Sequence, residues 1–197
     1  NGLRKIAQRI HKLTVILNES LNKIGIKQKN EIFFDTILCE GPSEKIKANA
    51  EQNKINLNYI DENHFSISLN ETTTIDDVQL LINIISKSIG FKTVDVDKEI
   101  NKIKIPEKLL RSTKFLENKI FNTHHSETSL MRYIKSLERK DLSLTQSMIS
   151  LGSCTMKLNA ASEMIPVSWS KWNNIHPFVP LYQAKGYQKL IKKLENK

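Results

Sequence analysis

Residues 2–25 read GLRKIAQRIHKLTVILNESLNKIG and set the architecture of the first part of the chain. Apolar side chains recur every three or four residues from Leu3 to Ile24, which is the period of one face of an α-helix. Gly25 follows as a residue suited to the left-handed conformation at a helix end. The pattern predicts a long amphipathic helix.

A strand and a second helix are predicted next. The stretch EIFFDTILCE, residues 31–40, is rich in β-branched and aromatic residues, and Gly41 with Pro42 signals a turn after it. Ser43 can then cap a short helix that runs to about Asn53.

A hairpin and a third helix are predicted after that. The segments INLNYI (55–60) and HFSISL (64–69) flank a turn-prone stretch and form the expected hairpin. Thr74 can cap a helix that ends at Gly90. Taken in order, these elements predict an α+β layer, with helices on one face of a small mixed sheet.

A domain boundary is expected where this regularity fades, between Phe91 and Lys108, and Pro106 disfavours helix just before it. The expected organisation is a small α+β domain at 1–90, a linker at 91–110 and a second unit at 111–197.

The second unit is expected to be irregular. Ser126 predicts a helix to about Arg139, residues 143–180 are mostly loop, and another helix begins near Tyr182. A loop of that length is usually functional or packs on something outside the sequence.

Composition describes a soluble globular chain of 197 residues, 39% hydrophobic, without an apolar run of about 20 residues that could span a bilayer. The first residue is not methionine, which indicates a fragment. The net charge of +9 comes from lysines spread singly along the chain, without interleaved aromatic residues. That distribution indicates solvated faces rather than a nucleic-acid partner.

Cysteine and histidine usage argues against disulfides and metals. Only Cys39 and Cys154 are present, which fits a reducing compartment and excludes a four-cysteine zinc site. The five histidines lack the i,i+4 pairing of zinc proteases, so no metal site is expected.

Residues 150–160, SLGSCTMKLNA, combine a glycine, hydroxyls, a thiol, an ammonium and an amide. Such chemistry indicates a loop built to approach a ligand. It continues as EMIPVSW, NIHPFVP and QAKGY. Together with FNTHHSETSLMRYIKSLERK (121–140), these motifs resemble the catalytic second half of the glycine decarboxylase P-protein family of the glycine cleavage system.

The first part also resembles this family. GLRKIAQRIHKLTVIL, FFDTI and ISLNETTTIDD (67–77) are similar to the small C-terminal domain that closes the first half. The resemblance implies a fragment of a fold-type I pyridoxal-phosphate (PLP) transferase, α/β overall, which spans the junction of the two halves. Two departures concern local packing: Ser150 replaces the family's usual proline, and His124 its usual tyrosine.

The resemblance implies that the parent enzyme decarboxylates glycine and transfers the aminomethyl group to the lipoyl group of the H-protein. It further implies PLP as electron sink and a homodimer of the full-length chain. The compartment is unknown from a fragment: bacterial cytoplasm is favoured, or the mitochondrial matrix in a eukaryote. Neither nucleic acid nor membrane is an expected partner.

The fragment is expected to be inactive alone and to contain no catalytic residue. The family's Schiff-base lysine lies before a glycine-rich stretch further along the protein, so Lys157 is not that lysine. No glycine-rich phosphate cup is recognisable. The residues assigned to the mouth of the active site are Ser153, Thr155, Lys157, Asn159 and His176. The first four serve equally well to satisfy the backbone of their own loop.

Three other side chains have two readings each. Cys154 is a redox-sensitive thiol or, as favoured, a buried inert one. His176 stacks near the cofactor, or packs with a backbone partner. His125 with Ser126 and Glu127 resembles a general base with its orienting group, but a helix cap explains the pair and is favoured.

Two functions of different classes remain open at this point. The first is a fragment of the glycine-decarboxylating enzyme. The alternative is a non-catalytic carrier-protein-binding or scaffold module derived from the same family. A continuing reading frame that carries a lysine before a glycine-rich segment favours the enzyme, and a stop codon favours the module.

Overall fold

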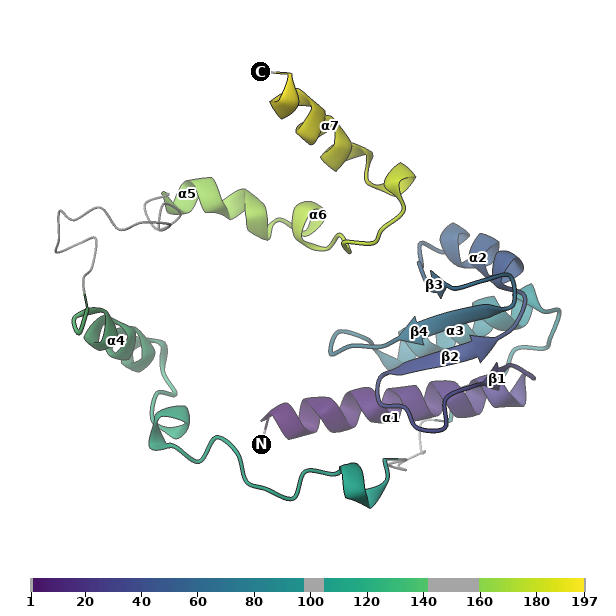
Figure 1. Ribbon diagram of the computed structural model, residues 1–197, viewed down its shortest axis with the longest axis horizontal. Coiled ribbons are helices and arrows are strands. Elements are labelled where there is room, and N and C mark those ends of the chain that lie inside the picture. Colours follow the sequence, from purple (N-terminus) through teal and green to yellow (C-terminus); the bar gives the residue numbers. More distant parts are fainter. Residues whose placement is uncertain (1, 98–104, 142–159, 197) are drawn as a thin grey trace. The chain divides into compact units, whose positions relative to one another are not determined.

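The computed structural model describes residues 2–97, 105–141 and 160–196. The chain divides into two compact units, residues 1–111 and 112–197. Each unit is described by itself below, with the elements labelled as in Figure 1.

The long first helix is confirmed as α1, Gly2–Lys23. Its buried part begins at Ile10, and the side chains from Leu13 to Leu21 lie almost entirely inside the unit. Gly25 has a φ of +84°, so the left-handed end of this helix is also confirmed.

The sheet has four strands in the order β1-β2-β4-β3, and every neighbouring pair is antiparallel. The prediction of a mixed sheet is therefore wrong. Helix α2 returns the chain so that β3 runs in the same direction as β2, but β4 lies between them and no parallel pair forms. The strands are β1 (Lys27–Gln28), β2 (Thr36–Glu40), β3 (Asn58–Tyr59) and β4 (His64–Ser68).

The predicted hairpin is confirmed as β3 and β4, whereas the strand predicted from residue 31 begins only at Thr36. Phe33 and Phe34, just before it, place their rings 5.9 and 5.7 Å from the His11 ring of α1. These aromatic residues therefore pack against α1 and do not extend the strand. Strand β1 was not predicted, because two residues are too few to show a period.

The two other helices of this unit are α2, Ser43–Gln52, and α3, Ile75–Ser88. Thr74 caps α3 as predicted, in a reciprocal capping box with Asp77. Ser43 does not cap α2: the helix begins after Pro42, and the Ser43 hydroxyl is buried inside the first turn.

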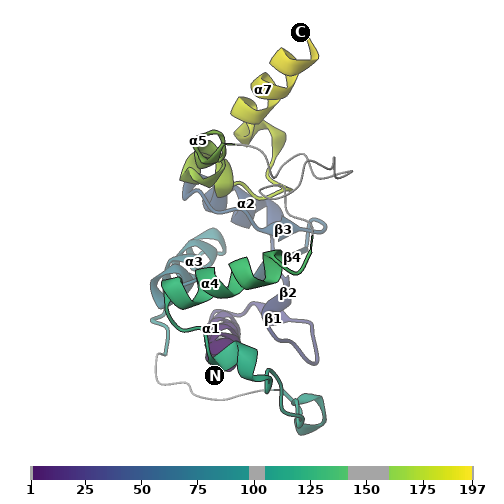
Figure 2. The same cartoon turned by 90° about the vertical axis from the view of Figure 1, so that its left-hand side faces the viewer.

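The core lies on one face of the sheet. Ile37 and Cys39 of β2 and Phe65 and Ile67 of β4 point to the same face, and the apolar sides of the three helices cover it. Figures 1 and 2 show α1, α2 and α3 on that side of the sheet. The prediction of helices on one face is confirmed, and the alternate residues of the strands form an outer face that is exposed or half-buried.

The second unit consists mainly of short helices. Its predicted helix after Ser126 is confirmed as α4. Residues 160–180 contain more helix than predicted, because helical segments of four residues are too short to show a period in the sequence. The helix predicted near Tyr182 begins later, at Lys185. The bounds are η1 Glu107–Leu109 in the first unit, then η2 Lys119–Asn122, α4 Glu127–Glu138, α5 Ala161–Met164, η4 Ile165–Ser168, α6 Ser170–Asn173, η5 Leu181–Gln183 and α7 Lys185–Glu195.

Candidate functional site

The predicted active-site loop falls mostly on residues outside the described ranges. Ser153, Thr155, Lys157 and Asn159 all lie there, as do Ser150 and Cys154. Of the five residues assigned to the mouth of the site, only His176 can be placed.

His176 lies between α6 and η5 and is exposed. Its Nδ1 accepts a hydrogen bond from the Phe178 backbone N–H at 3.1 Å, and its ring is tilted against the Phe178 ring at 5.7 Å. The backbone partner expected for a structural histidine is present. The Nδ1 lone pair is used in this turn, which leaves Nε2 as the ring nitrogen for any further partner.

The segment around His176 is held together by contacts between α6 and α7. The Trp172 and Tyr187 rings meet edge to face, with centroids 5.1 Å apart, and the Tyr187 hydroxyl donates to the Trp172 carbonyl. Gln188 donates to the Leu181 carbonyl at 2.6 Å. These contacts fix the turn that presents His176.

The histidine pair before α4 has a structural role. Ser126 caps the helix by accepting from the Ser129 N–H, as favoured from the sequence. The His125 Nε2 donates to the Asn122 carbonyl at 2.8 Å, and the His124 ring stacks on the Tyr133 ring at 4.4 Å. His124 thus packs through its ring at the position where a tyrosine was expected.

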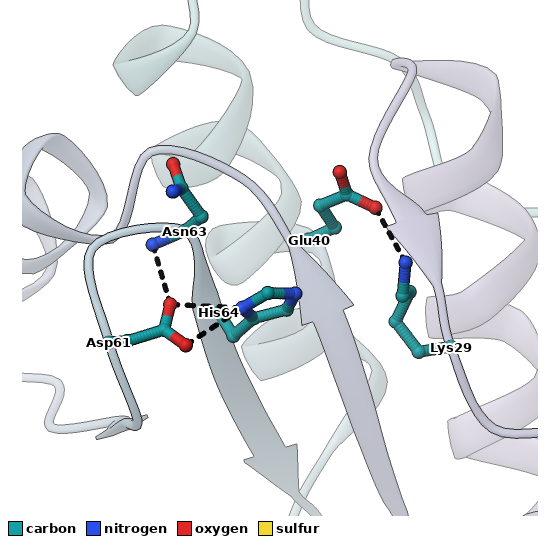
Figure 3. A network of polar contacts seen from close by, with 5 residues as sticks. All are labelled: Lys29, Glu40, Asp61, Asn63 and His64. Atoms are coloured by element: carbon teal, nitrogen blue, oxygen red, sulfur yellow. Dashed lines mark hydrogen bonds and ion pairs between the residues drawn. The ribbon is translucent and has the colours of Figure 1, made fainter.

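A charged network lies at one end of the sheet (Figure 3). Glu40 and His64 face each other across β2 and β4. Lys29 Nζ lies 2.9 Å from the Glu40 carboxylate, and the His64 Nδ1 lies 2.9 Å from both oxygens of Asp61. Figure 3 shows Asp61 and Glu40 on opposite sides of the His64 ring.

The network favours ionised carboxylates. The hydrogen bond from Lys29 lowers the pKa of Glu40, and the backbone N–H of Asn63, followed by His64, lowers the pKa of Asp61. Both carboxylates are solvent-exposed and already paired: Glu40 joins β2 to the segment after β1, and Asp61 closes the turn before β4. The network lacks the raised-pKa acid or unpaired base that proton transfer needs.

Arg9 makes a contact that the sequence analysis missed. Its guanidinium donates to the Glu71 carbonyl at 2.8 Å and to the Thr73 carbonyl at 2.6 Å, and so attaches α1 to the loop before α3. The local sequence around an arginine on the polar face of a helix does not predict a hydrogen bond to a residue 62 positions further along the chain.

Cys39 is a structural thiol. It is buried in β2, and desolvation raises its pKa to about 12, which leaves no reactive thiolate near neutral pH.

Three of the described glycines have structural roles. Gly25 and Gly90 end helices with positive φ, and a Cβ on Gly41 would lie 2.9 Å from Ile26 Cδ1, so these glycines serve the fold. Among the described residues no lysine is buried, whereas a Schiff-base lysine works inside a closed pocket.

Two further findings concern the described part of the chain. None of its helices has both the length and the apolar character needed to cross a bilayer. Within the same ranges, no three side chains of the His, Cys, Asp and Glu types gather where they could hold a metal ion.

Comparison with protein families matches residues 1–85 to the model of the glycine cleavage system P-protein. Glycine dehydrogenase (decarboxylating) of Flavobacterium johnsoniae is 53% identical over 194 residues, which is 98% of this chain and 20% of that relative. The enzyme of the same name from Christiangramia forsetii is 50% identical over 99% of this chain and 20% of its own length.

A second form from Pseudomonas fluorescens is 46% identical over 98% of this chain. The chain therefore spans about a fifth of the length of the curated relatives it matches. Among solved structures, a chain titled NifS-like protein aligns with 45% of this chain and 29% of its own length, at a TM-score of 0.40 and 18% identity. A likeness at that level supports no conclusion about function.

Proposed function

We propose that this chain, a homologue of glycine dehydrogenase (decarboxylating), is the part of a PLP-dependent glycine decarboxylase that joins its two halves. One observation supports this most strongly. The alignments with these two relatives, at 53% and 50% identity, cover 98% and 99% of the chain and so include both units.

The domain assignment follows the same reasoning. Residues 1–90 would be the small α+β domain that closes the first half, residues 91–110 a linker, and residues 111–197 the start of the catalytic second half. In support, the first unit contains a core of its own, and the matched family model ends at residue 85, near the end of α3.

The loop at 150–160 would supply polar groups to the active site of the long enzyme. Ser153, Thr155 and Asn159 offer neutral donors, and Lys157 offers a cation to a carboxylate or phosphate. The cofactor, once bound, acts as the electron sink for loss of the glycine carboxyl group. Its Schiff-base lysine would lie beyond this chain, which is then inactive alone.

The partners follow from this role. They are glycine, the lipoyl-carrying H-protein that receives the aminomethyl group, and a second copy of the full-length enzyme. The relatives named above are bacterial, which favours the bacterial cytoplasm as the location.

The test is to express the complete reading frame with PLP and to measure exchange of the glycine carboxyl carbon with labelled bicarbonate. Lys157→Ala and Asn159→Ala should each reduce exchange by about tenfold or more, with cofactor absorbance unchanged. Lys171→Ala, in the short helix α6, is the control and should retain exchange.

Two outcomes would contradict the proposal. A complete frame that binds no PLP and shows no exchange favours a non-catalytic carrier-binding or scaffold module. Full exchange in both loop variants would remove the loop from the active site, while the enzyme assignment itself would stand.

A further inference from the structure

Two helices of the second unit present exposed apolar stripes. On α4, Leu130, Ile134 and Leu137 follow one another at intervals of four and three residues and are 42 to 49% exposed. On α7, Leu190, Ile191 and Leu194 share one face and are 42 to 67% exposed. They are called the α4 stripe and the α7 stripe below. Exposed apolar faces of this kind usually mark a contact with another surface.

The charges of these helices lie on the other side. At 100° per residue, Arg132, Lys135 and Arg139 fall on the face of α4 opposite its stripe. The same geometry places three lysines, Lys185, Lys189 and Lys192, opposite the α7 stripe, and Lys193 at its flank. Each helix can therefore bury its stripe and keep its cations in water.

The described residues of the second unit form almost no core to hold these helices. In its described ranges, 112–141 and 160–196, Ala184 is the sole apolar residue that is buried. The first unit, in contrast, has a contiguous buried cluster drawn from three helices and the sheet. Helices of 11 and 12 residues are marginal in water without tertiary packing, so α4 and α7 need a covering surface.

The length of polypeptide outside this part indicates what kind of surface covers the stripes. A surface on the same polypeptide needs much less contact area than a separate protein does, because the covalent link raises its effective concentration. The relatives supply such a surface, since four fifths of their length lies outside the part matched here.

We propose that the α4 and α7 stripes dock onto the remainder of a longer polypeptide and that these helices become stably folded only there. This inference rests on the proposed function, because it requires a full-length protein of the glycine dehydrogenase type. The second unit is thus a docking arm, and the first unit is a self-sufficient domain.

Hydrogen exchange followed by mass spectrometry tests this directly. The complete reading frame and the 197-residue chain are compared for peptides covering 127–138 and 185–195. Both peptides should exchange on the order of a hundredfold more slowly in the complete frame. Equal exchange in the two proteins overturns the proposal. So does protection in the 197-residue chain that grows with its concentration, because a second copy would then cover the stripes.

A pair of matched variants identifies the surface used. In the complete frame, Leu190→Lys with Leu194→Lys should remove most of the protection of α7, whereas Lys189→Gln with Lys192→Gln on the opposite face should preserve it. The peptides of α1 must remain protected in both, which shows that the first unit is still folded. Loss of protection in both variants or in neither contradicts docking through the stripe.

The exchange and activity assays separate this inference from the proposed function. If α7 is protected in a complete protein that shows no bicarbonate exchange, the docking proposal is supported and the proposed enzyme function is contradicted. If the complete protein is active but α7 is not protected from hydrogen exchange, only the docking proposal is contradicted.

Discussion

Side-chain bonds to the backbone order the first unit locally, notably in the loop before α3. The Asn70 Oδ1 accepts from the backbone N–H groups of Thr72 and Thr73 at 3.0 and 3.1 Å. Thr74 then caps the helix, and Arg9 holds two carbonyls of the loop. The loop is therefore ordered by polar contacts. The sequence predicts the cap at Thr74, but no local pattern predicts the contact made by Arg9.

Thr74→Ala should lower the free energy of unfolding by about 1 kcal/mol, because the Asp77 N–H loses its acceptor at the helix start. Urea unfolding followed by far-ultraviolet circular dichroism measures this. Thr72→Ala is the control and should cost less, since its hydroxyl donates only to the Asn70 side chain. Equal losses in the two variants would count against the cap.

Stability should fall in acid through the carboxylates with lowered pKa values, Glu40, Asp61 and Asp77. A pKa that is lower in the folded state stabilises the fold above the unfolded value. That contribution is lost as the pH drops below the ordinary values, 4.5 for Glu and 3.8 for Asp, through the folded ones.

The urea midpoint of the parent chain should accordingly decrease between pH 6 and pH 3. The midpoint of Asp61→Asn should decrease less steeply over the same range. Glu31→Gln, at an exposed carboxylate outside the network, is the control and should follow the parent. A steeper acid loss in Asp61→Asn would contradict the sign of the effect.

At the scale of elements, the helices were well predicted and the strands less so. The 3.6-residue period of α1 extends over six turns, and the caps of α3 and α4 are chemically specific. The ends of strands depend on which neighbour accepts their hydrogen bonds, and this is why residues 31–35 could not be distinguished from β2. Ser43 is not the cap because α2 begins at Ser43 itself and Pro42 occupies the cap position.

The sheet and helices meet at Phe65, whose side chain is fully buried in β4. Phe65→Ala should destabilise the first unit by about 3 to 5 kcal/mol through lost burial and a residual cavity. Leu80→Ala is the matched control: it removes apolar volume from α3 at a position that is 40% exposed, and its cost should be much smaller. Similar costs would show that the sheet is not the centre of the core.

At the scale of the whole molecule, the two units differ in kind. The first buries apolar residues from all its main elements, whereas the apolar residues of the second whose burial is described are, apart from Ala184, exposed or half-buried. Cooperative unfolding of the isolated chain should therefore report the first unit.

The urea m-value of the isolated 197-residue chain should match a domain of about 100 residues, because m scales with the surface that unfolding exposes. A chain truncated after Asp97 should unfold with nearly the same midpoint and slope. A slope about twice as large for the longer chain would show that the second unit is part of one cooperative fold.

The sequence by itself indicated the resemblance to the glycine cleavage system P-protein, the α+β character of the first part and the polar character of residues 150–160. These properties depend on residue identity and on short-range periodicity, both of which are written along the chain. It also determined the caps at Thr74 and Ser126, because a cap involves neighbours within three residues.

Only the tertiary structure decided that the sheet is wholly antiparallel, that Arg9 anchors a loop 62 residues away, and that Glu40 faces His64. These features join segments distant in sequence, and no local pattern encodes which strand inserts between two others. The same reason explains the second unit: the sequence shows the amphipathic stripes of α4 and α7, but whether a core covers them is a property of the folded chain.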